Sequence, residues 1–239
     1  MPVVQPTCVV VDDMDAVGDC NQTAPPDSFE PDVQSEWQGD RAEIYVVVTP
    51  LVANLTDDDA NGTIDLCDIP DIVVVAFATL GGPAHIHVLD GETGMLHYTF
   101  PDIVDFSVAP ALGDIDGDGL PEIVTANSSG NLMAFEHDGT LKWQSPDIWT
   151  GSYIGAIALA DMDNDGDVEI AAGNQLFDHL GNLLWTAPQV AGANSATALA
   201  DLDGDGALEM VLGHAECPGM GRGHELRAWR RLGPPRRAP

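Results

Sequence analysis

Basic side chains are scarce in this sequence. Lysine and arginine contribute 8 residues against 39 aspartates and glutamates, which gives a formal net charge of −31. Nucleic acids and anionic membrane surfaces attract proteins through positive charge, so this imbalance argues against both as partners. Very acidic chains are often disordered, but 44% of these residues are hydrophobic, and apolar runs alternate with acidic loops. The composition therefore predicts a folded protein.

Long apolar runs are also missing. No stretch approaches the roughly 18 apolar residues of a membrane-spanning helix, so no membrane insertion is expected. The first residues, Met-Pro-Val-Val-Gln-Pro, show no basic region followed by an apolar one, and no signal peptide is visible. A helical solenoid is excluded, because helical periodicity is absent and the chain has 25 glycines and 17 prolines.

The chain has only four cysteines, and they are too scattered for a zinc ribbon or a CxxC redox site. Cys8 and Cys20 are close enough in sequence to close a small disulfide loop, which fits an oxidising compartment. Two unpaired thiols are an equal alternative. We expect residues 1–34 to be a leader or linker that carries this cysteine pair.

The few basic residues are unevenly placed. Six of the eight lie in the last 18 positions: Arg222, Arg227, Arg230, Arg231, Arg236 and Arg237. A basic interaction arm is one interpretation of residues 215–239. We favour a disordered or artificially terminated tail, because the change in composition falls inside a repeat.

Between residues 35 and 214 one acidic loop motif occurs four times. The copies occupy residues 57–68, 114–122, 161–169 and 201–209, so they begin 40 to 57 residues apart. Each has side-chain oxygens at loop positions 1, 3, 5 and 9 and glycine at position 6. Self-similarity at this period is typical of propellers and solenoids.

The segments around the loops predict β-strands. An apolar stretch enters each loop, and a short, buried-looking strand follows it: Ile72–Ala76, Ile123–Ala126, Ile170–Gly173 or Met210–Gly213. In the first three units a glycine-containing turn then joins two more apolar runs. Four short antiparallel strands, repeated, predict the blades of an all-β propeller.

The predicted array is incomplete. We expect about three full blades with pieces at both ends, because Ser35–Trp37 is typical of the last strand of a preceding blade and Ile44–Val48 of an entering strand. Tyr98, Trp143 and Trp185 occupy matching points on the fourth strands, where large rings can fill the space between neighbouring sheets. An open array leaves unpaired edges, so we expect the remaining blades in the rest of a longer chain.

The loops have the chemistry of a calcium site. Carboxylates that converge within about 4–5 Å repel one another by several kcal/mol unless a cation neutralises them. Oxygen donors at positions 1, 3, 5 and 9, with a backbone carbonyl at position 7, suit Ca²⁺ better than the octahedral Mg²⁺. We predict up to four Ca²⁺ ions, with a structural role and a melting temperature that falls on chelation.

The candidate ligands follow from the loop positions. They are Asp57, Asp59, Asn61, Thr63, Asp65 and Asp68 in the first loop; Asp114, Asp116, Asp118, Leu120 and Glu122 in the second; Asp161, Asp163, Asp165, Asp167 and Glu169 in the third; and Asp201, Asp203, Asp205, Ala207 and Glu209 in the fourth. Thr63, Leu120, Asp167 and Ala207 would bind through their backbone carbonyls. In the longer first loop Asp68 is the preferred closing ligand, and Asp71 is the alternative.

Over residues 36–214 these repeats resemble the FG-GAP/VCBS-type repeats, the calcium-loop propeller blades also found in integrin α subunits. The resemblance implies Ca²⁺ in each loop, an extracellular or cell-surface setting and usually seven blades. The chain differs from integrins because no leg or membrane segment is recognisable, so an adhesion role does not follow from the resemblance alone.

No catalytic constellation is identifiable. His85 and His87 share a strand face, but no third zinc ligand lies near them in sequence, so we expect them to be structural. We predict a secreted or surface scaffold, not an enzyme, that binds an unknown protein or carbohydrate ligand. One alternative is the propeller portion of a secreted polysaccharide-degrading enzyme, and another is a structural segment of a large surface protein.

Overall fold

The computed structural model describes residues 33–150, 154–162, 164–187, 197–204, 208–214 and 225–229. These residues form β-strands and connecting loops, with no helix among them. The strands make three four-stranded sheets and one three-stranded sheet within the described ranges, and all the strand pairs are antiparallel. The predicted all-β class is confirmed.

Each sheet uses consecutive strands in chain order. The first contains β1 (Leu51–Ala53), β2 (Asp71–Phe77), β3 (Ala84–Asp90) and β4 (Leu96–Thr99); the second β5 (Ala111–Gly113), β6 (Glu122–Ala126), β7 (Asn131–Phe135) and β8 (Leu141–Ile148); the third β9 (Ile157–Ala160), β10 (Glu169–Ala172), β11 (Gln175–Phe177) and β12 (Leu183–Thr186); the fourth β13 (Thr197–Ala200), β14 (Glu209–His214) and β15 (Glu225–Trp229).

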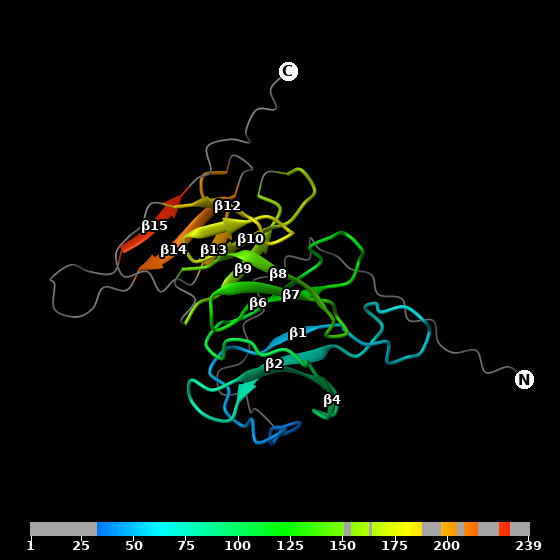
Figure 1. Cartoon of the computed structure of the whole chain (residues 1–239). Helices are drawn as coiled ribbons and strands as arrows, with labels where there is room; N and C mark the ends of the chain where they lie inside the picture. Colours follow the sequence, from blue (N-terminus) through cyan, green and yellow to red (C-terminus); the bar gives the residue numbers. More distant parts are fainter. Residues whose placement is uncertain are drawn as a thin grey trace, which may run out of the picture.

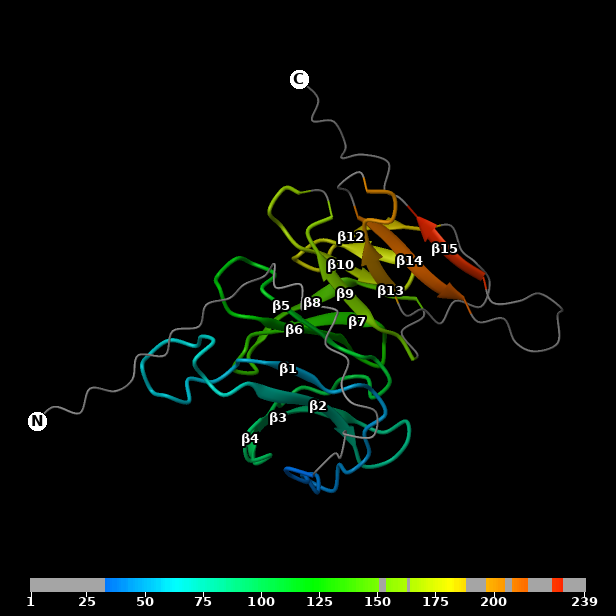
Figure 2. The ribbon, with the colours of Figure 1, turned by 180° about the vertical axis from the view of Figure 1, so that it is seen from behind.

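The sheets lie side by side in chain order, as Figures 1 and 2 show from opposite sides. The first strands of neighbouring sheets contact one another: β1 meets β5, β5 meets β9 and β9 meets β13. Such first strands lie along the inner side of a propeller, and the later strands of each blade extend outward. The array in the described ranges is open, as predicted for a partial propeller-like fold.

Hydrophobic cores fill the spaces between successive sheets. Strand β2 shows how the sequence achieves this, because side chains alternate between the two faces of a strand. Val73, Val75 and Phe77 pack against the second sheet, whereas Val74 and Ala76 belong to a cluster with Trp37 on the other face. A strand buried on both faces needs a continuous apolar run, which is what residues 72–77 provide.

The matching aromatic residues bridge adjacent sheets, as predicted. Tyr98 packs in the core shared by the first and second sheets, Trp143 in the next core and Trp185 in the third. The Tyr98 hydroxyl also donates a 2.5 Å hydrogen bond to the backbone carbonyl of His137, which lies in the β7–β8 turn of the second sheet. These rings are packing residues that link each blade to the next.

Two strand predictions near the start of the array are wrong. Ser35–Trp37 forms no strand, and Ile44–Val48 contributes only one isolated bridge, between Tyr45 and Phe77. A buried side chain explains the different course of this segment. Glu43 is only 6% exposed, and its carboxylate contacts His85 Nδ1 at 2.7 Å and His87 Nε2 at 3.0 Å. His85 and His87 therefore anchor residues 37–45 against β3, as structural residues.

The expectation of a disordered tail does not hold for part of residues 215–239. Glu225–Trp229 forms β15, which pairs along β14 from Met210 to His214. The other residues of that segment lie outside the described ranges, as do residues 1–32. No helix in the described part is long and apolar enough to cross a membrane.

Candidate metal sites at the hairpin loops

Each predicted loop joins the first two strands of a sheet, and the second strand begins with an acid. Glu122, Glu169 and Glu209 are each paired with the last residue of the preceding strand. Their carboxylates turn back into the loop and accept the backbone N–H of Ile115 (2.8 Å), Met162 (2.8 Å) and Leu202 (2.9 Å). All three acids are buried. The closing acid of each loop is thus fixed by the strand register.

The first acid of each loop binds the backbone of its own turn. Asp114 accepts the N–H groups of Gly117, Asp118 and Gly119, at 2.7 to 3.2 Å. The third loop has the same contacts from positions 5 and 6 to Asp161, and in the fourth Asp201 accepts the Gly204 N–H at 2.7 Å. A carboxylate oxygen has two lone pairs, so these bonds leave capacity for a cation.

The backbone must turn sharply at two loop positions. The glycine at position 6 has a positive φ in the three loops where it is described, namely 92° at Gly62, 93° at Gly119 and 97° at Gly166. Position 4 is also left-handed in all four loops, and is occupied by Ala60, Gly117, Asn164 and Gly204. Position 6 was expected from the sequence. Position 4 was missed, although Gly and Asn at three of the four copies were a signal.

The loops bring carboxylates together. One oxygen from each of Asp114, Asp116 and Glu122 lies within 4.8 Å of the others, and the same is true of Asp201, Asp203 and Glu209. In the first loop the group is Asp57, Asp59 and Asp68. In the third loop Asp163 lies outside the described residues, as do Asp205 and Ala207 in the fourth.

Other predicted ligands serve the loop backbone. The position 5 side chains of Asn61, Asp118 and Asp165 each accept the N–H of the residue at position 7: Thr63 (2.8 Å), Leu120 (2.8 Å) and Asp167 (3.0 Å). Asp65 accepts the N–H of Cys67 at 2.7 Å. Asp65 is not in the group formed by Asp57, Asp59 and Asp68.

The first loop is an insertion into the common hairpin. Asp71 is paired with Ala53, and its carboxylate accepts the Leu55 N–H at 2.9 Å, so Asp71 is the register equivalent of Glu122. By the same register Asn54, not Asp57, stands where Asp114 does. The inserted residues nevertheless repeat the loop contacts, because Asp57 accepts the N–H groups of Asn61 and Gly62 at 3.0 and 2.9 Å.

Asp68 and Asp71 therefore have separate places. Asp68 closes the inserted loop and accepts the N–H groups of Asp65 (2.8 Å), Asp58 (2.9 Å) and Asp59 (3.3 Å). These backbone hydrogen bonds, that from Asp65 most of all, lower the pKa of Asp68 below its usual range. Burial instead raises the pKa of Asp71. Asp68 thus lies with Asp57 and Asp59, and its role as the closing metal ligand stays a prediction.

A lysine from the fourth strand enters the second loop. Lys142 Nζ contacts Asp116, Glu122 Oε1 (3.3 Å) and Glu136 Oε1 (2.9 Å). Burial disfavours the charged ammonium, but the hydrogen bonds to Asp116 and Glu136 and the charge of Glu122 outweigh it and raise the pKa of Lys142. Its hydrogen bond lowers the pKa of Asp116, whereas burial raises that of Glu122. No local pattern in the sequence points to Lys142, because it lies 20 residues or more from Asp116 and Glu122.

Cys67, in the inserted loop, is disulfide-bonded. The other three cysteines, including the predicted pair of Cys8 and Cys20, lie outside the described residues. The pairing of Cys8 with Cys20 stays a prediction.

The donor sets fit a hard cation. The three groups are built from carboxylates alone, on loops whose backbone N–H groups already bind carboxylate oxygens, and oxygen donors are what Ca²⁺ prefers. Asp57, Asp59 and Asp68 would hold an ion in the first loop; Asp114, Asp116 and Glu122 in the second; and Asp201, Asp203 and Glu209 in the fourth. A bound Ca²⁺ would neutralise their mutual repulsion. In the second loop it would compete with Lys142.

Comparison with known protein families supports the repeat that the sequence predicts. Residues 114–172 match the model of the FG-GAP-like repeat family, and they span the second hairpin loop through β10. No curated protein matches the sequence of the chain.

Several solved structures match this chain. The crystal structure of the V. cholerae biofilm matrix protein Bap1 is 29% identical, with a TM-score of 0.66 over 77% of this chain and 32% of that one. The chain thus spans about a third of that structure. BBS1N, solved in complex with ARL6DN, is 16% identical, with a TM-score of 0.42 over 81% of this chain and 52% of that one. Residues 114–172 thus match the FG-GAP-like repeat family, in an all-β chain that resembles part of a biofilm matrix protein.

Proposed function

We propose that this chain is a calcium-binding segment of a secreted or surface protein, and that it acts as an adhesion or matrix scaffold without catalysis. The observation that carries the proposal is the recurrence of one carboxylate group at one place in the fold. In the first, second and fourth sheets, acids gather at the hairpin between the first two strands. A repeated position favours a structural role, because a catalytic centre needs one such site rather than several.

The proposed role of Ca²⁺ follows from the strand register. Glu122 and Glu209 begin the second strands, whereas Asp114 and Asp201 follow directly after the first strands. An ion held by both members of such a pair would tie the two strands together at the loop. The fold would then gain stability with the free calcium concentration, because the unfolded chain lacks the assembled site.

Two further observations support the extracellular part of the proposal. Cys67 is disulfide-bonded, and disulfides persist mainly in oxidising compartments. The similar protein Bap1 is described as a biofilm matrix protein. The net charge of −31 would also be smaller with several divalent ions bound, which reduces self-repulsion in the array.

Calcium titration of the full chain tests the metal part. We expect isothermal titration calorimetry to detect Ca²⁺ binding, and excess EDTA to lower the melting temperature substantially. The double variant D201N/D203N removes two acids from the fourth-loop group and should bind fewer ions. Melting curves that are identical in EDTA and Ca²⁺ would contradict the proposal.

A separate assay tests the absence of catalysis. The purified chain is incubated with alginate and with pectin in the presence of Ca²⁺, and reducing ends and chain length are followed. We expect no depolymerisation. Cleavage that disappears in a variant of this chain would instead favour the polysaccharide-degrading alternative.

A further inference from the structure

The fourth strands of the first three sheets share an equivalent position, and in the first two sheets its side chain contacts the acid that begins the second strand. Each has a β-bulge, which leaves one residue between two paired neighbours without a partner across the ladder. That residue is His97 in the first sheet, Lys142 in the second and Leu184 in the third. The same structural position thus carries a different side chain in each of the three sheets.

In the second sheet this place holds a positive charge. The Lys142 ammonium contacts Glu122 at the start of β6 and Glu136 directly after β7. The corresponding acids of the first sheet are Asp71, at the start of β2, and Asp90, at the end of β3. His97 Nε2 lies 3.3 Å from Asp71 Oδ1 and 3.7 Å from Asp90 Oδ2.

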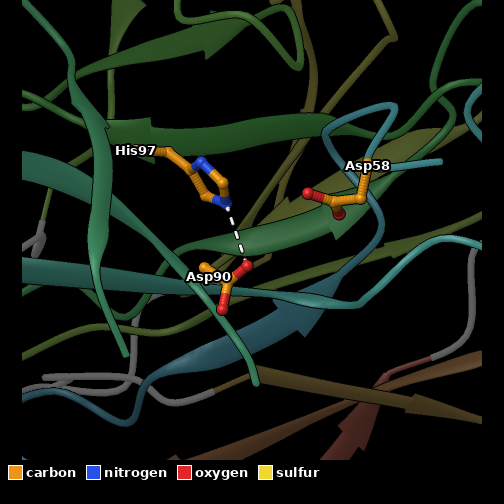
Figure 3. Close-up of side chains that lie close together, drawn as sticks. All are labelled: Asp58, Asp90 and His97. Atoms are coloured by element: carbon orange, nitrogen blue, oxygen red, sulfur yellow. Dashed lines mark ion pairs between the residues drawn. The ribbon is translucent and has the colours of Figure 1, made fainter. Parts of the chain in front are cut away.

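The inserted loop adds another carboxylate to the first sheet. One ligand atom from each of Asp58, Asp90 and His97 lies within 4.8 Å of the others, and Figure 3 shows these side chains turned toward one another. The Thr56 hydroxyl lies 3.2 Å from Asp58 Oδ2 and 3.0 Å from Asp71 Oδ2. The group is therefore continuous with Asp71.

One oxygen in this group lacks a hydrogen-bond donor. Asp71 is fully buried at 0% exposure, and while Oδ2 accepts the Leu55 N–H and the Thr56 hydroxyl, Oδ1 accepts no hydrogen bond within the described structure. A buried acceptor without a partner costs free energy, about 1–3 kcal/mol for a neutral group and more for a charged one. An imidazole can present an unprotonated ring nitrogen to a metal ion, which the ammonium of Lys142 cannot do.

We propose that Asp71, Asp90 and His97, with Asp58, bind a divalent transition-metal ion, Zn²⁺ in the first instance, at a site whose ligands differ from those of the calcium groups. The donor set decides the class of ion. One imidazole nitrogen with carboxylate oxygens suits Zn²⁺, whereas Ca²⁺ takes oxygen donors.

The distances agree with this assignment. Ligand atoms about 2.1 Å from a tetrahedral Zn²⁺ are about 3.4 Å from one another. The separations of 3.3 and 3.7 Å around His97 Nε2 are close to that value. The His97 side chain is 29% exposed and Asp58 is exposed, so an ion can enter from solvent and Asp58 can adjust.

The third sheet shows what the site requires. Leu184 stands at the bulge and offers no ligand atom, and the acid equivalent to Asp90 is Asp178. That carboxylate accepts hydrogen bonds from the Leu180 N–H (3.0 Å) and the Asn182 side chain (2.9 Å). Within the described residues, only the first of the three sheets therefore places a side chain that can ligate Zn²⁺ at this bulge.

Zinc titration of the full chain in millimolar Ca²⁺ tests the proposal, because Ca²⁺ occupies the oxygen-only loops. We expect isothermal titration calorimetry to detect about one Zn²⁺ per chain. H97Q should weaken binding by at least about 100-fold, since even residues that merely support a ligand contribute 10–100-fold. H179Q is a matched control: His179 is 26% exposed and lies 3.7 Å from Asp167. It should leave zinc affinity unchanged.

The variant H97K separates metal binding from folding. It places an ammonium where the second sheet has Lys142, so it should fold with a melting temperature in EDTA at least that of the wild type, yet lose zinc binding. Wild-type protein that binds no Zn²⁺ in Ca²⁺ would overturn the proposal. So would equal zinc affinity in the wild type, H97Q and H97K. The outcome is independent of calcium binding, because the zinc site shares no ligand with the calcium groups.

Discussion

Replacing Lys142 with methionine probes how the second hairpin balances its charge. Methionine keeps a long, flexible side chain but removes the ammonium that contacts Asp116, Glu122 and Glu136. In EDTA the Glu122 carboxylate, 1% exposed, would keep only its 2.8 Å hydrogen bond from the Ile115 N–H. The variant should therefore be less stable than the wild type when no cation is available.

The magnitude follows from the exposure of each partner. Breaking a buried ion pair by removing one member costs about 3–5 kcal/mol. The lower end applies here, because Lys142 is 18% exposed, and the contacts to Asp116 and Glu136, which are 34% and 28% exposed, contribute at most about 1 kcal/mol each. We expect a loss of about 3 kcal/mol in the free energy of unfolding, or roughly 6–12 °C in melting temperature.

Calcium should reverse the defect. An ion bound by Asp114, Asp116 and Glu122 replaces the lost positive charge, and it no longer competes with an ammonium. In saturating Ca²⁺ we expect the difference in unfolding free energy between K142M and the wild type to shrink below about 1 kcal/mol. Calorimetry should also show that K142M binds Ca²⁺ more tightly than the wild type.

Urea denaturation in EDTA and in Ca²⁺ measures both differences. L184M is the matched control, because Leu184 occupies the equivalent bulge on an exposed surface and should change stability by no more than about 0.5 kcal/mol. Equal stability of K142M and the wild type in EDTA would refute the charge argument. A deficit that is the same in EDTA and in Ca²⁺ would refute calcium binding by the second loop.

Three other predictions concern the fold. Burial lowers the pKa of His87 below its usual value of 6.5. The fold is therefore more stable above pH 6.5, where His87 is neutral in both states, and this stability is lost as the pH falls toward the lowered pKa. H87Q should flatten the curve of unfolding free energy against pH below about pH 6.5. At Gly139 φ is 86°, and a Cβ would lie only 2.8 Å from the Phe100 ring, so G139A should lose about 2–4 kcal/mol of unfolding free energy in urea denaturation. G81A is the control, because φ is also positive there but the space is open, and it should lose about 1 kcal/mol. Similar losses in the two variants would exclude the packing explanation. Ala60 has a φ of 58°, so A60G should raise the unfolding free energy by about 0.5–1 kcal/mol, and a loss would show that the left-handed turn is unstrained.

Local regularities in the sequence were sufficient to predict the blades. The spacing of the acidic loops and the short apolar runs around them located the second strands of the four sheets to within one or two residues. The prediction failed at Ser35–Trp37 and at Ile44–Val48, although the second of these segments has high β-propensity. There the course of the chain is set by the packing of Trp37 and by the contacts of Glu43 with two histidines. Partners more than forty residues away leave no local pattern.

The loop chemistry divides in the same way. The type and spacing of the candidate ligands, and the glycine at position 6, are written in the sequence, because each loop is one short segment with a fixed internal geometry. The sequence does not show which acid of the first loop corresponds to Glu122. Asp68 precedes β2 and Asp71 begins it, and only the pairing of Asp71 with Ala53 separates their roles.

By itself the sequence determined that this is a repeated all-β chain with acidic hairpins, since those properties depend on residue type and short spacing. The tertiary structure alone decided which side chains face those hairpins from the outer strands. His97 and Lys142 are 26 residues from the acids Asp71 and Asp116, and a β-bulge in the fourth strand aims them inward. The register of distant strands, which no local pattern encodes, thus sets the charge balance of each hairpin.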